Sequence, residues 1–500
     1  MNRTPLPAAL DASAASRPSR FPAGRPLPPG TLDRLRAACA DVTTGDAGRV
    51  EAGRDWWPLS TWWAVDSTAP ALPEAVCRPE TADEVSSVLR ICDEARVPVT
   101  PFAGASGVCG GSIPVHGGVS LDLTGLGGIV SLDPESLLVE VRAGTFGPDL
   151  ESALRADGYT LGHWPQSIDL STVGGWVACR GAGQYSTRYG KIEDMVAGLE
   201  VVLADGRIIR TGGTAPRAAT GPDLTQLFVG SEGTLGVITS ARLRIHPAPP
   251  AERRAAYGFQ SFDAGLDACR RVLRRGATPA VLRLYDPAES ARNFDVADTA
   301  LLIVVDEGDP GLVDAVMQVV GSEAAAVGAS QLDPELAGRW LERRNHLPPV
   351  ADLVRGGLVV DTVEIAAPWS ALPSIYRDAL AGLSALEGTL AASAHQSHAY
   401  TDGACLYFTF AGRPTAPGLD AAESYYRRAF DAVTAATAAS HGAISHHHGI
   451  GLNRARYLVG HLGPAFGVLQ AVKDALDPNG ILNPGKLGLA DRFGAVGDVP

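Results

Sequence analysis

Apolar and polar residues follow two different rhythms along the first half of this chain. Residues 119–123 and 138–141 alternate apolar and polar positions, which is typical of half-buried strands. Residues 81–92 instead keep the spacing of one apolar helix face behind a capping box. Residues 199–203 and 207–210 flank an Asp-Gly pair and predict a β-hairpin. This part of the chain is therefore predicted to mix helices and strands.

The second half repeats the mixture after a stiff, proline-rich segment at residues 246–250. Residues 262–273 keep one helix face apolar, and a strand is predicted at 280–284. A further strand at 301–305 precedes a helix at 309–320. The predicted fold class is α+β, in two domains. The expected boundaries are residues 1–65 for a mobile N-terminal tail and Trp-rich arm, 66–250 for the first domain, and 251–500 for a second domain whose last segment returns to the first.

Composition narrows the class of protein. The 500 residues are 45% hydrophobic and 19% charged, which is typical of a globular chain. The net charge of -13 disfavours a nucleic-acid partner, and the longest apolar run is too short to span a bilayer. The seven cysteines form no CxxC pair, which favours a reducing cytoplasm over disulfides or a zinc site. The N-terminus lacks the apolar core of a signal peptide, so the expected location is cytoplasmic.

Three loops rich in glycine and other small residues offer the first chemistry. They lie at residues 101–107, 171–176 and 230–236, and each is flanked by apolar runs. Glycine lets a backbone approach a pyrophosphate closely, and serine and threonine add hydroxyl donors. A single such loop is equally compatible with an ordinary hairpin. Three together favour a long cofactor that is held at several places.

With these loops in view, the chain resembles the flavoproteins of the vanillyl-alcohol oxidase superfamily, which bind FAD in a p-cresol methylhydroxylase-type domain. The most similar branch is that of the alkyl-dihydroxyacetone-phosphate synthases. Besides the loops, the resemblance depends on five ordered segments, at residues 162–165, 189–194, 404–407, 445–449 and 477–486. It covers about residues 70 to 490, and it implies a two-part FAD-binding domain followed by an α+β cap over the flavin.

The resemblance also implies which residues contact FAD. They are Pro101, Phe102, Ala103, Gly104, Ala105, Ser106, Gly107, Gln166, Ser167, Ile168, Asp169, Leu170, Ser171, Thr172, Cys179, Arg180, Gly181, Ala182, Gly230, Ser231, Glu232, Gly233, Thr234, Leu235, Gly236 and Ile238. Members with covalent flavin often carry a histidine in or near the first loop, and here there is none. Cys109 is the nearby nucleophile, and a plain buried cysteine is its expected role. We therefore expect non-covalent FAD.

Four residues are the expected acid–base machinery: Tyr407 and the run His446, His447 and His448. Consecutive histidines on one strand or turn point in different directions, so at most two can face one site. In the synthase branch the corresponding tyrosine lies near the flavin N5 together with the histidine run. A phenol and an imidazole within hydrogen-bond reach can relay a proton. A buried core tyrosine and a chance polar cluster are the competing interpretations.

A metal site is not expected. Related 2-hydroxy-acid dehydrogenases have a histidine-rich motif before a Gly-Asp-Gly turn and a histidine after it. This chain keeps His398 and Asp402, but Tyr407 fills the later position. The loss of that ligand leaves too few partners for a well-defined divalent site.

Arg283 lies where the family keeps a substrate-site arginine, and its guanidinium could bind a carboxylate or a phosphate. Its alternative role is a salt bridge, for example to Asp286. The synthases place a second arginine that holds the substrate phosphate, and that position here is Val350 or Ala351. None of three nearby arginines falls in register: Arg343, Arg344 and Arg355. The phosphate site of the synthases is therefore predicted to be lost.

These observations predict an FAD-dependent oxidoreductase that passes a hydride from an alcohol or 2-hydroxy-acid carbon to flavin N5. In this prediction Tyr407 with His447 or His448 takes the hydroxyl proton, and Arg283 orients an acidic group. The alternative is an alkyl-dihydroxyacetone-phosphate synthase, which carries out ether-lipid synthesis without net redox change. A flavin-binding protein without turnover is the third class. The expected partner is a small-molecule substrate, and a homodimer is left open.

Overall fold

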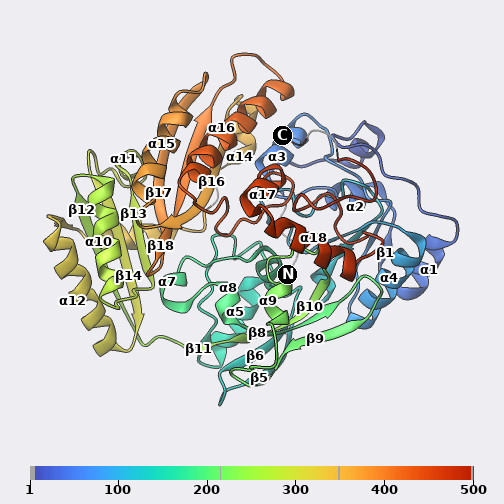
Figure 1. Ribbon diagram of the computed structural model, residues 1–500, viewed down its shortest axis with the longest axis horizontal. Helices are drawn as coiled ribbons and strands as arrows, with labels where there is room; N and C mark the ends of the chain where they lie inside the picture. Colours follow the sequence, from blue (N-terminus) through green and yellow to red (C-terminus); the bar gives the residue numbers. More distant parts are fainter. Residues whose placement is uncertain (1–5, 214, 347–348, 497–498, 500) are drawn as a thin grey trace.

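The computed structural model describes residues 6–213, 215–346, 349–496 and 499 (Figure 1). A four-stranded sheet near the N-terminus has the order β1-β2-β4-β3. Its strands β2, β4 and β3 are parallel, and β1 pairs antiparallel with β2. The helix between β2 and β3 begins after Thr81, whose side chain accepts a hydrogen bond from the Glu84 amide as the capping box predicts. The elements are β1 (Val42–Thr43), β2 (Ala75–Cys77), α4 (Ala82–Ala95), β3 (Val99–Phe102) and β4 (Val119–Asp122).

A second, antiparallel sheet of five strands has the order β5-β6-β10-β8-β9. Val139 and Val141 of β6 are buried while their neighbours Leu138, Glu140 and Arg142 are more exposed, as the sequence alternation predicts. The helices α5 and α6 add their apolar faces to the core of this sheet. The elements are β5 (Ile129–Asp133), β6 (Leu138–Arg142), α5 (Gly147–Ala156), α6 (Val173–Cys179), β8 (Val196–Val202), β9 (Ile208–Gly212) and β10 (Val237–Arg244). The short strands β7 (Tyr159–Thr160) and β11 (His246–Pro247) pair beside it.

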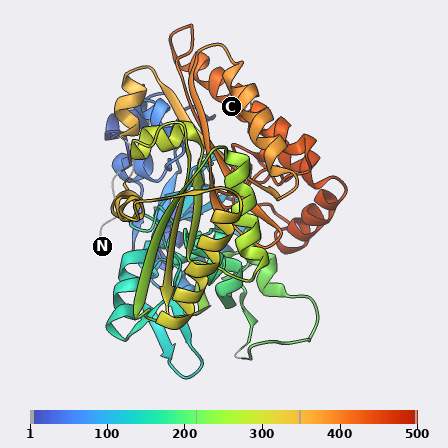
Figure 2. The ribbon, with the colours of Figure 1, turned by 90° about the vertical axis from the view of Figure 1, so that its left-hand side faces the viewer.

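The seven-stranded antiparallel sheet of the C-terminal half has the order β15-β12-β14-β13-β17-β18-β16. One face packs on four long helices and forms the largest core of the molecule (Figures 1 and 2). The strands are β12 (Ala251–Phe259), β13 (Val281–Tyr285), β14 (Ala300–Gly308), β15 (Ser330–Leu332), β16 (Val359–Pro368), β17 (Thr389–Ala399) and β18 (Gly403–Gly412). The helices are α10 (Phe262–Arg274), α12 (Pro310–Ala326), α15 (Leu372–Ser384) and α16 (Leu419–Ala439).

The alternation of side chains along these strands determines which residues lie on the face of the sheet opposite the four helices. Leu282 and Leu284 of β13 belong to the helix-covered core, and so do Leu406 and Phe408 of β18. Because successive side chains of a strand point to opposite faces, Arg283 and Tyr407 belong to the other face. That face looks toward the first two sheets, and α7 (Ser186–Tyr189) and α13 (Glu335–Arg343) cover part of it.

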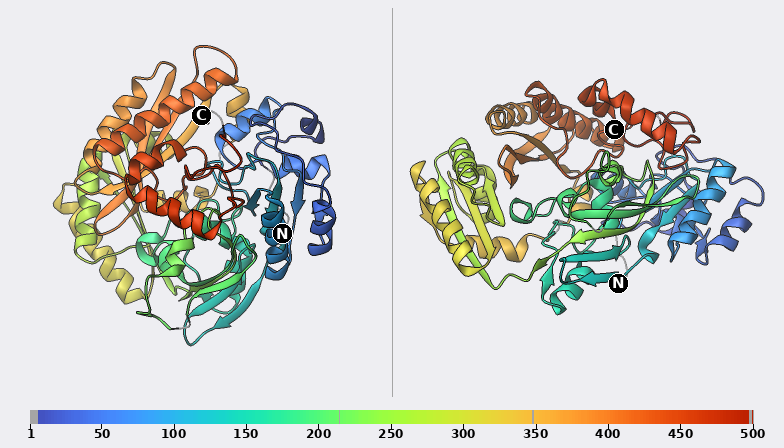
Figure 3. Two further views of the ribbon diagram at one scale, coloured as in Figure 1. Left: turned by 45° about the vertical axis from the view of Figure 1, so that its right-hand side comes forward. Right: turned by 60° about the horizontal axis from the view of Figure 1, so that its bottom comes forward.

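The C-terminal segment returns to the N-terminal half. The helices α17 (Ala455–Leu462) and α18 (Ala465–Leu476) lie beside the green and blue segments in Figure 3. The Lys473 ammonium donates to the Thr234 carbonyl at 2.8 Å, and Leu482 forms a parallel bridge with Val99. The Asn483 amide donates to the carbonyls of Gly111 and Glu232. These bonds explain the role of the segment at residues 477–486, which fastens the end of the chain to the glycine-rich loops.

The N-terminal arm differs from the sequence prediction. In the described part of the N-terminal tail, which was expected to be mobile, Phe21 is buried and Arg20 forms a salt bridge with Glu423 of α16. The indole of Trp57 donates to Tyr426 at 2.9 Å, so this tryptophan packs on the second domain. The arm is held because apolar and paired groups of α16 meet it, which composition alone does not reveal. Among the described residues, no helix has the length and apolarity needed to cross a membrane.

The other short elements connect these layers. They are η1 (Ala12–Ser16), α1 (Thr31–Ala38), α2 (Asp46–Glu51), α3 (Pro58–Val65), η2 (Leu123–Gly125), α8 (Ile192–Met195), α9 (Leu224–Phe228), α11 (Pro287–Phe294) and α14 (Val350–Arg355).

Candidate active site

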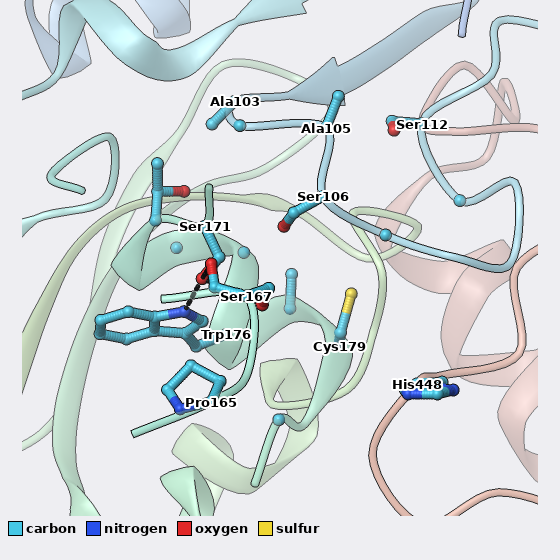
Figure 4. A pocket seen from close by; sticks show the side chains of 18 of the residues that line it. Ala103, Ala105, Ser106, Ser112, Pro165, Ser167, Ser171, Trp176, Cys179 and His448 are labelled. Carbon is cyan, nitrogen blue, oxygen red and sulfur yellow. Dashed lines mark hydrogen bonds between the residues drawn. The ribbon is translucent and has the colours of Figure 1, made fainter. Parts of the chain in front are cut away.

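A cavity of about 300 Å³ lies between the glycine-rich loops and the open face of the seven-stranded sheet. Figure 4 shows Ala105 and Ser106 on one side of it, Ser171 and Trp176 on another, and His448 at the far end. The cavity therefore joins the two halves of the chain. Cavities between domains are common sites for small molecules and cofactors.

Most of the residues predicted to contact FAD line this cavity. They are Pro101, Phe102, Ala103, Gly104, Ala105, Ser106, Gly107, Gln166, Ser167, Leu170, Ser171, Thr172, Cys179, Gly181, Ala182, Glu232, Gly233, Gly236 and Ile238. Seven others of the predicted set do not line it: Ile168, Asp169, Arg180, Gly230, Ser231, Thr234 and Leu235. Some of these belong to the framework instead, since Ile168 and Leu235 pack in the core of the five-stranded sheet and the Thr234 hydroxyl donates to the Ser231 carbonyl.

The predicted list of FAD contacts left out part of the lining, including Gly174, Gly175 and Trp176 of the glycine-rich loop at residues 171–176. The additional residues are Trp56, Val108, Gly111, Ser112, Leu123, Ala143, Pro165, Gly174, Gly175, Trp176, Ala178, Gln184, Val237 and His398. Several of them directly continue the predicted loops, so that longer loop boundaries would have included them. Trp56 and Leu123 come from elsewhere in the chain and carry no motif of their own.

The glycines of these loops are needed where they stand. A Cβ on Gly104 would collide with the carbonyl of Leu170, and a Cβ on Gly233 would lie 2.5 Å from Cγ of Pro101. Gly233 also has φ +73°, in the left-handed region that favours glycine. The loops thus approach one another as closely as backbone permits. The sequence in this region is fixed by space as well as by ligand chemistry.

The lining fits the expected flavin dinucleotide. It is mostly apolar, as a ring system requires, and a few hydroxyl and amide side chains interrupt it. The hydroxyl of Thr172 is buried and has no hydrogen-bond partner among the described residues, although it lines the cavity. A buried hydroxyl without a partner costs free energy. A ligand oxygen or nitrogen at this position would satisfy it.

Tyr407 lies at the end of the cavity that is lined by the second domain. Its phenol is within hydrogen-bond distance of His447 Nε2 at 2.6 Å and of His448 Nε2 at 2.9 Å. Burial raises the pKa of Tyr407 well above its ordinary value and lowers the pKa of His447 to about 3 and of His448 to about 4. At neutral pH the phenol and both imidazoles are therefore uncharged. The three groups can exchange protons without leaving a buried charge behind.

Glu364 holds the histidine run in place. It is the cross-strand neighbour of Tyr407, and its carboxylate accepts hydrogen bonds from the backbone amides of His446 and His448. Burial opposes its ionisation, but the adjacent Arg454 guanidinium, the imidazoles of His448 and His447 and the His446 amide together lower the pKa of Glu364. Sequence reasoning did not select Glu364 or Arg454 for this role. They lie far apart in the chain and meet only in the folded protein.

His446 does not line the cavity, so two histidines of the run line the site, which is the most that was expected. Its Nδ1 lies 2.8 Å from His447 Nδ1. His398, Cys405, His446 and His447 place one donor atom each within 4.8 Å of one another. The proximity of these donor atoms does not test the prediction that the chain holds no metal.

Arg283 lines the same cavity and does not pair with Asp286, its suggested partner. Its Nε donates to the Tyr285 hydroxyl at 2.7 Å, and its Nη2 lies 2.6 Å from His395 Nε2. His395 in turn lies 2.8 Å from Glu289 through Nδ1. The guanidinium is therefore held on two sides by neighbours on the sheet, with N–H groups left to reach a substrate.

The three arginines considered for the phosphate differ in position. Arg344 donates to the cavity-lining Gln184 at 3.2 Å, and its guanidinium lies 5.7 Å from the ring centroid of Trp340, which Arg283 also contacts. Arg355 pairs with Asp352, and Arg343 is exposed. The positions expected to carry the lost arginine do not line the cavity, because α14 packs on α3 and Ala351 is buried beside Ala8 and Ala64. The sequence register therefore points to two positions that lie outside the cavity.

Glu232 links the third loop to the histidine run. Its carboxylate accepts hydrogen bonds from the amides of Ile450 at 2.6 Å and Gly451 at 2.8 Å. Glu232 adopts φ +49°, a conformation that a non-glycine residue takes up only when its surroundings hold it. The loop expected at the cofactor and the acid–base group are thus fixed relative to each other.

Comparison with known proteins agrees with this geometry. Residues 73–212 match the family of FAD binding domains, and residues 248–487 match the C-terminal domain of FAD linked oxidases. An uncharacterized FAD-linked oxidoreductase of Escherichia coli O157:H7 is 32% identical over 83% of this chain and 89% of its own length. The glycolate oxidase subunit GlcD of Bacillus subtilis is 31% identical, with the same coverage. The alkyldihydroxyacetonephosphate synthase of Dictyostelium discoideum is 29% identical over 83% of this chain and 73% of its own length.

Solved structures show the same fold. An alkyldihydroxyacetonephosphate synthase superimposes with a TM-score of 0.79 at 24% identity, covering 95% of this chain and 88% of that chain. p-Cresol methylhydroxylase with substrate bound superimposes with a TM-score of 0.73 at 18% identity, covering 93% of this chain and 98% of that chain. The expected two-domain architecture and the FAD cofactor are confirmed. The chain belongs to the FAD-linked oxidoreductases with a p-cresol methylhydroxylase-type fold.

Proposed function

We propose that this protein dehydrogenates an alcohol or a 2-hydroxy acid. The observation that carries the proposal is the pairing, in one cavity, of a neutral acid–base group with a fixed cation. Tyr407 and His447 form the acid–base group, and Arg283 is the cation. A 2-hydroxy acid carries a hydroxyl to be deprotonated and a carboxylate to be held, so it matches both features.

The residues of the chain then have separate tasks. Arg283 donates its free N–H groups to the substrate carboxylate and orients the carbon that bears the hydroxyl. Tyr407 accepts the hydroxyl proton while its own proton passes to an imidazole nitrogen of His447 or His448. The bound flavin supplies the acceptor for the hydride that leaves the same carbon. The names of relatives support this assignment, since glycolate is a 2-hydroxy acid.

A second candidate is the synthase reaction of ether-lipid synthesis. Arg344 favours it, because this residue contacts the cavity-lining Gln184 and shares the Trp340 ring with Arg283. Two guanidinium groups near one cavity suit a phosphate better than one does. The likeness to alkyldihydroxyacetonephosphate synthases supports the same candidate. We rank it second because Arg344 itself does not line the cavity.

Anaerobic mixing with glycolate, D-lactate, simple alcohols and acyl-dihydroxyacetone phosphate separates the two functions. We expect bleaching of the flavin absorbance by a non-phosphorylated hydroxy compound and weak binding of the phosphate ester. Arg344→Gln should leave that bleaching within about twofold of the parent, as the exposed Arg343→Gln control does. Micromolar binding of acyl-dihydroxyacetone phosphate with exchange of its acyl group for a fatty alcohol, lost in Arg344→Gln alone, would replace our assignment by the synthase.

A further inference from the structure

A continuous series of hydrogen bonds leads from Tyr407 away from the cavity. The phenol lies 2.6 Å from His447 Nε2, and His447 Nδ1 lies 2.8 Å from His446 Nδ1. His446 Nε2 lies 3.0 Å from the Tyr400 hydroxyl, which lies 3.1 Å from Ser186 Oγ. Every contact in the series is within normal hydrogen-bond distance. No step requires a side chain to move.

The series starts inside the cavity and ends outside it. Tyr407 and His447 line the cavity, whereas His446, Tyr400 and Ser186 do not. Tyr400 is half-buried, and its ring faces the Lys191 ammonium at 4.7 Å. Lys191 pairs with the exposed carboxylate of Asp194. The Tyr400 ring thus lies beside charged groups that are in contact with solvent, while its hydroxyl contacts the buried Ser186.

Hydrogen-bond rules allow the series two complete directions. In the outward direction Tyr407 donates to His447 Nε2, His447 Nδ1–H donates to His446 Nδ1, and His446 Nε2–H donates to Tyr400. In the inward direction every donor becomes an acceptor, and both histidines exchange tautomers. A neutral imidazole carries one N–H and one acceptor nitrogen, so each ring fits either direction. Passage of one proton from end to end converts the outward direction into the inward one.

The surroundings of the two histidines favour this neutral exchange. Burial lowers the pKa of His446 to about 3 and that of His447 to about 3. The rings of both lie 4.9 Å from the ring of His398, which burial likewise keeps uncharged at neutral pH. The charged groups nearby are Glu364 and Arg454, which pair with each other, Lys191, which pairs with Asp194, and the cation Arg283. Lys191 and Arg283 each oppose a charged imidazole in the run, which favours the neutral exchange.

We propose that Tyr407, His447, His446 and Tyr400 form a proton path between the active-site cavity and the surface near Lys191. The proposal rests on the proposed dehydrogenation. In that reaction the C–H bond breaks and its electron pair leaves as hydride to the flavin, while the O–H electrons form the carbonyl. The hydroxyl proton enters at Tyr407, each member of the series hands its own proton outward, and one proton leaves at Tyr400. The same path run inward supplies a proton when an acceptor reoxidises the flavin.

The direct test replaces Tyr400 by phenylalanine, which keeps the ring and removes the hydroxyl. The matched control is Tyr457→Phe, because Tyr457 bonds Asp431 on α16 and lies outside the series. Flavin reduction and proton release, the latter followed with a pH-indicator dye, are recorded in one stopped-flow experiment. We expect Tyr400→Phe to reduce its flavin within about threefold of the parent, with proton release about tenfold slower and restored by added imidazole. Proton release that keeps pace with the parent would overturn the path.

A second readout does not depend on turnover. Selective ¹⁵N labelling of the 11 histidines resolves imidazole tautomers by nuclear magnetic resonance, with His446→Asn and His447→Asn used for assignment. The path requires His446 and His447 to hold opposite tautomers, one protonated at Nε2 and the other at Nδ1. Equal tautomers would overturn it, and so would a stoichiometric metal ion in the purified protein bound between the two Nδ1 atoms. If no hydroxy compound bleaches the flavin, the dehydrogenase assignment fails while this measurement still decides the path.

Discussion

The rings of His395 and Tyr407 are stacked, with centroids 4.9 Å apart and planes inclined by 9°. The two residues are cross-strand neighbours on β17 and β18. His395 Nε2 also accepts from Arg283 Nη2 at 2.6 Å. One imidazole therefore touches both the acid–base phenol and the cation that we assign to the substrate.

Glu289→Gln tests how Arg283 is held. His395 Nδ1–H donates to the Glu289 carboxylate, which leaves Nε2 free to accept from Arg283. An amide side chain weakens this bond by about 1.5 kcal/mol, because the acceptor loses its charge. We expect KM for a 2-hydroxy acid to rise by about tenfold, with little change for a neutral alcohol.

The control for that variant is Glu323→Gln. The Glu323 carboxylate on the outer helix α12 pairs with Arg271 of α10 and with Arg275, which directly follows α10. Steady-state kinetics with the two substrates is the measurement. An equal rise in KM for the acid and the alcohol would show that Glu289 supports the fold of the cavity and not the position of Arg283.

Tyr407→Phe should keep FAD and its spectrum while turnover falls by about two to four orders of magnitude, the usual contribution of a positioned acid–base group. His447→Ala should behave similarly, since it shares the same 2.6 Å hydrogen bond. Because the two residues act together, the double variant should lose little more than either single one. Flavin absorbance and kcat are measured for the parent, the two single variants and the double variant, which together form a double-mutant cycle. Additive losses would show that the residues act independently.

The sequence predicts the local parts of this site well. The spacing of the apolar residues in β13 and in β18 places Arg283 and Tyr407 opposite the apolar positions of their own strands, and the sheet order then puts both on the same face. The glycine-rich loops are equally local, because their residues are adjacent in the chain. The domain boundaries at residues 65 and 250 and the assigned roles of the site residues stay predictions.

The remaining parts depend on pairings between distant segments. Glu364 and His395 flank Tyr407 only because β16, β18 and β17 are adjacent in the sheet. This strand order cannot be inferred from the sequence. The same holds for Arg454, which reaches Glu364 across 90 residues. The inferred site of the second arginine failed for a related reason. Counting along the sequence could not reveal that α14 packs on the N-terminal arm.

Gly233→Val should abolish stable FAD binding. The left-handed backbone of Gly233 disfavours a β-branched residue, and the new side chain would meet the Pro101 ring. The matched control is Gly127→Val, since a Cβ at the exposed Gly127 has no atom within 4 Å. The ratio of flavin to protein absorbance after purification is the measurement. Full occupancy in Gly233→Val would remove this loop from the cofactor site.

The flavin should leave the protein on acid precipitation and colour the supernatant. No histidine lies in residues 101–107, and Cys109 does not line the cavity. Cys179 does line it, but burial raises its pKa to about 12, so it is a protonated thiol and a poor nucleophile at neutral pH. Yellow colour in the pellet, with a matching mass increase of the chain, would contradict the expected non-covalent cofactor.

Acid should destabilise the protein through the histidine run. The pKa of His446 and His447 is lowered to about 3, whereas an unfolded histidine titrates near 6.5. Below about pH 6.5 the unfolded state binds protons that the folded state does not, so stability falls as the pH falls toward the folded pKa values. Above that pH this contribution is complete and constant. His446→Asn should therefore show a flatter decline of the urea midpoint between pH 7 and 5, and the midpoint of the exposed His461→Asn variant should decline like that of the parent.

The slope of the urea midpoint against pH is the decisive quantity, because a variant that merely loses packing is less stable by the same amount at every pH. Parallel slopes for His446→Asn and the parent would mean that His446 is charged in the folded state, and the neutral exchange between His446 and His447 would have to be abandoned.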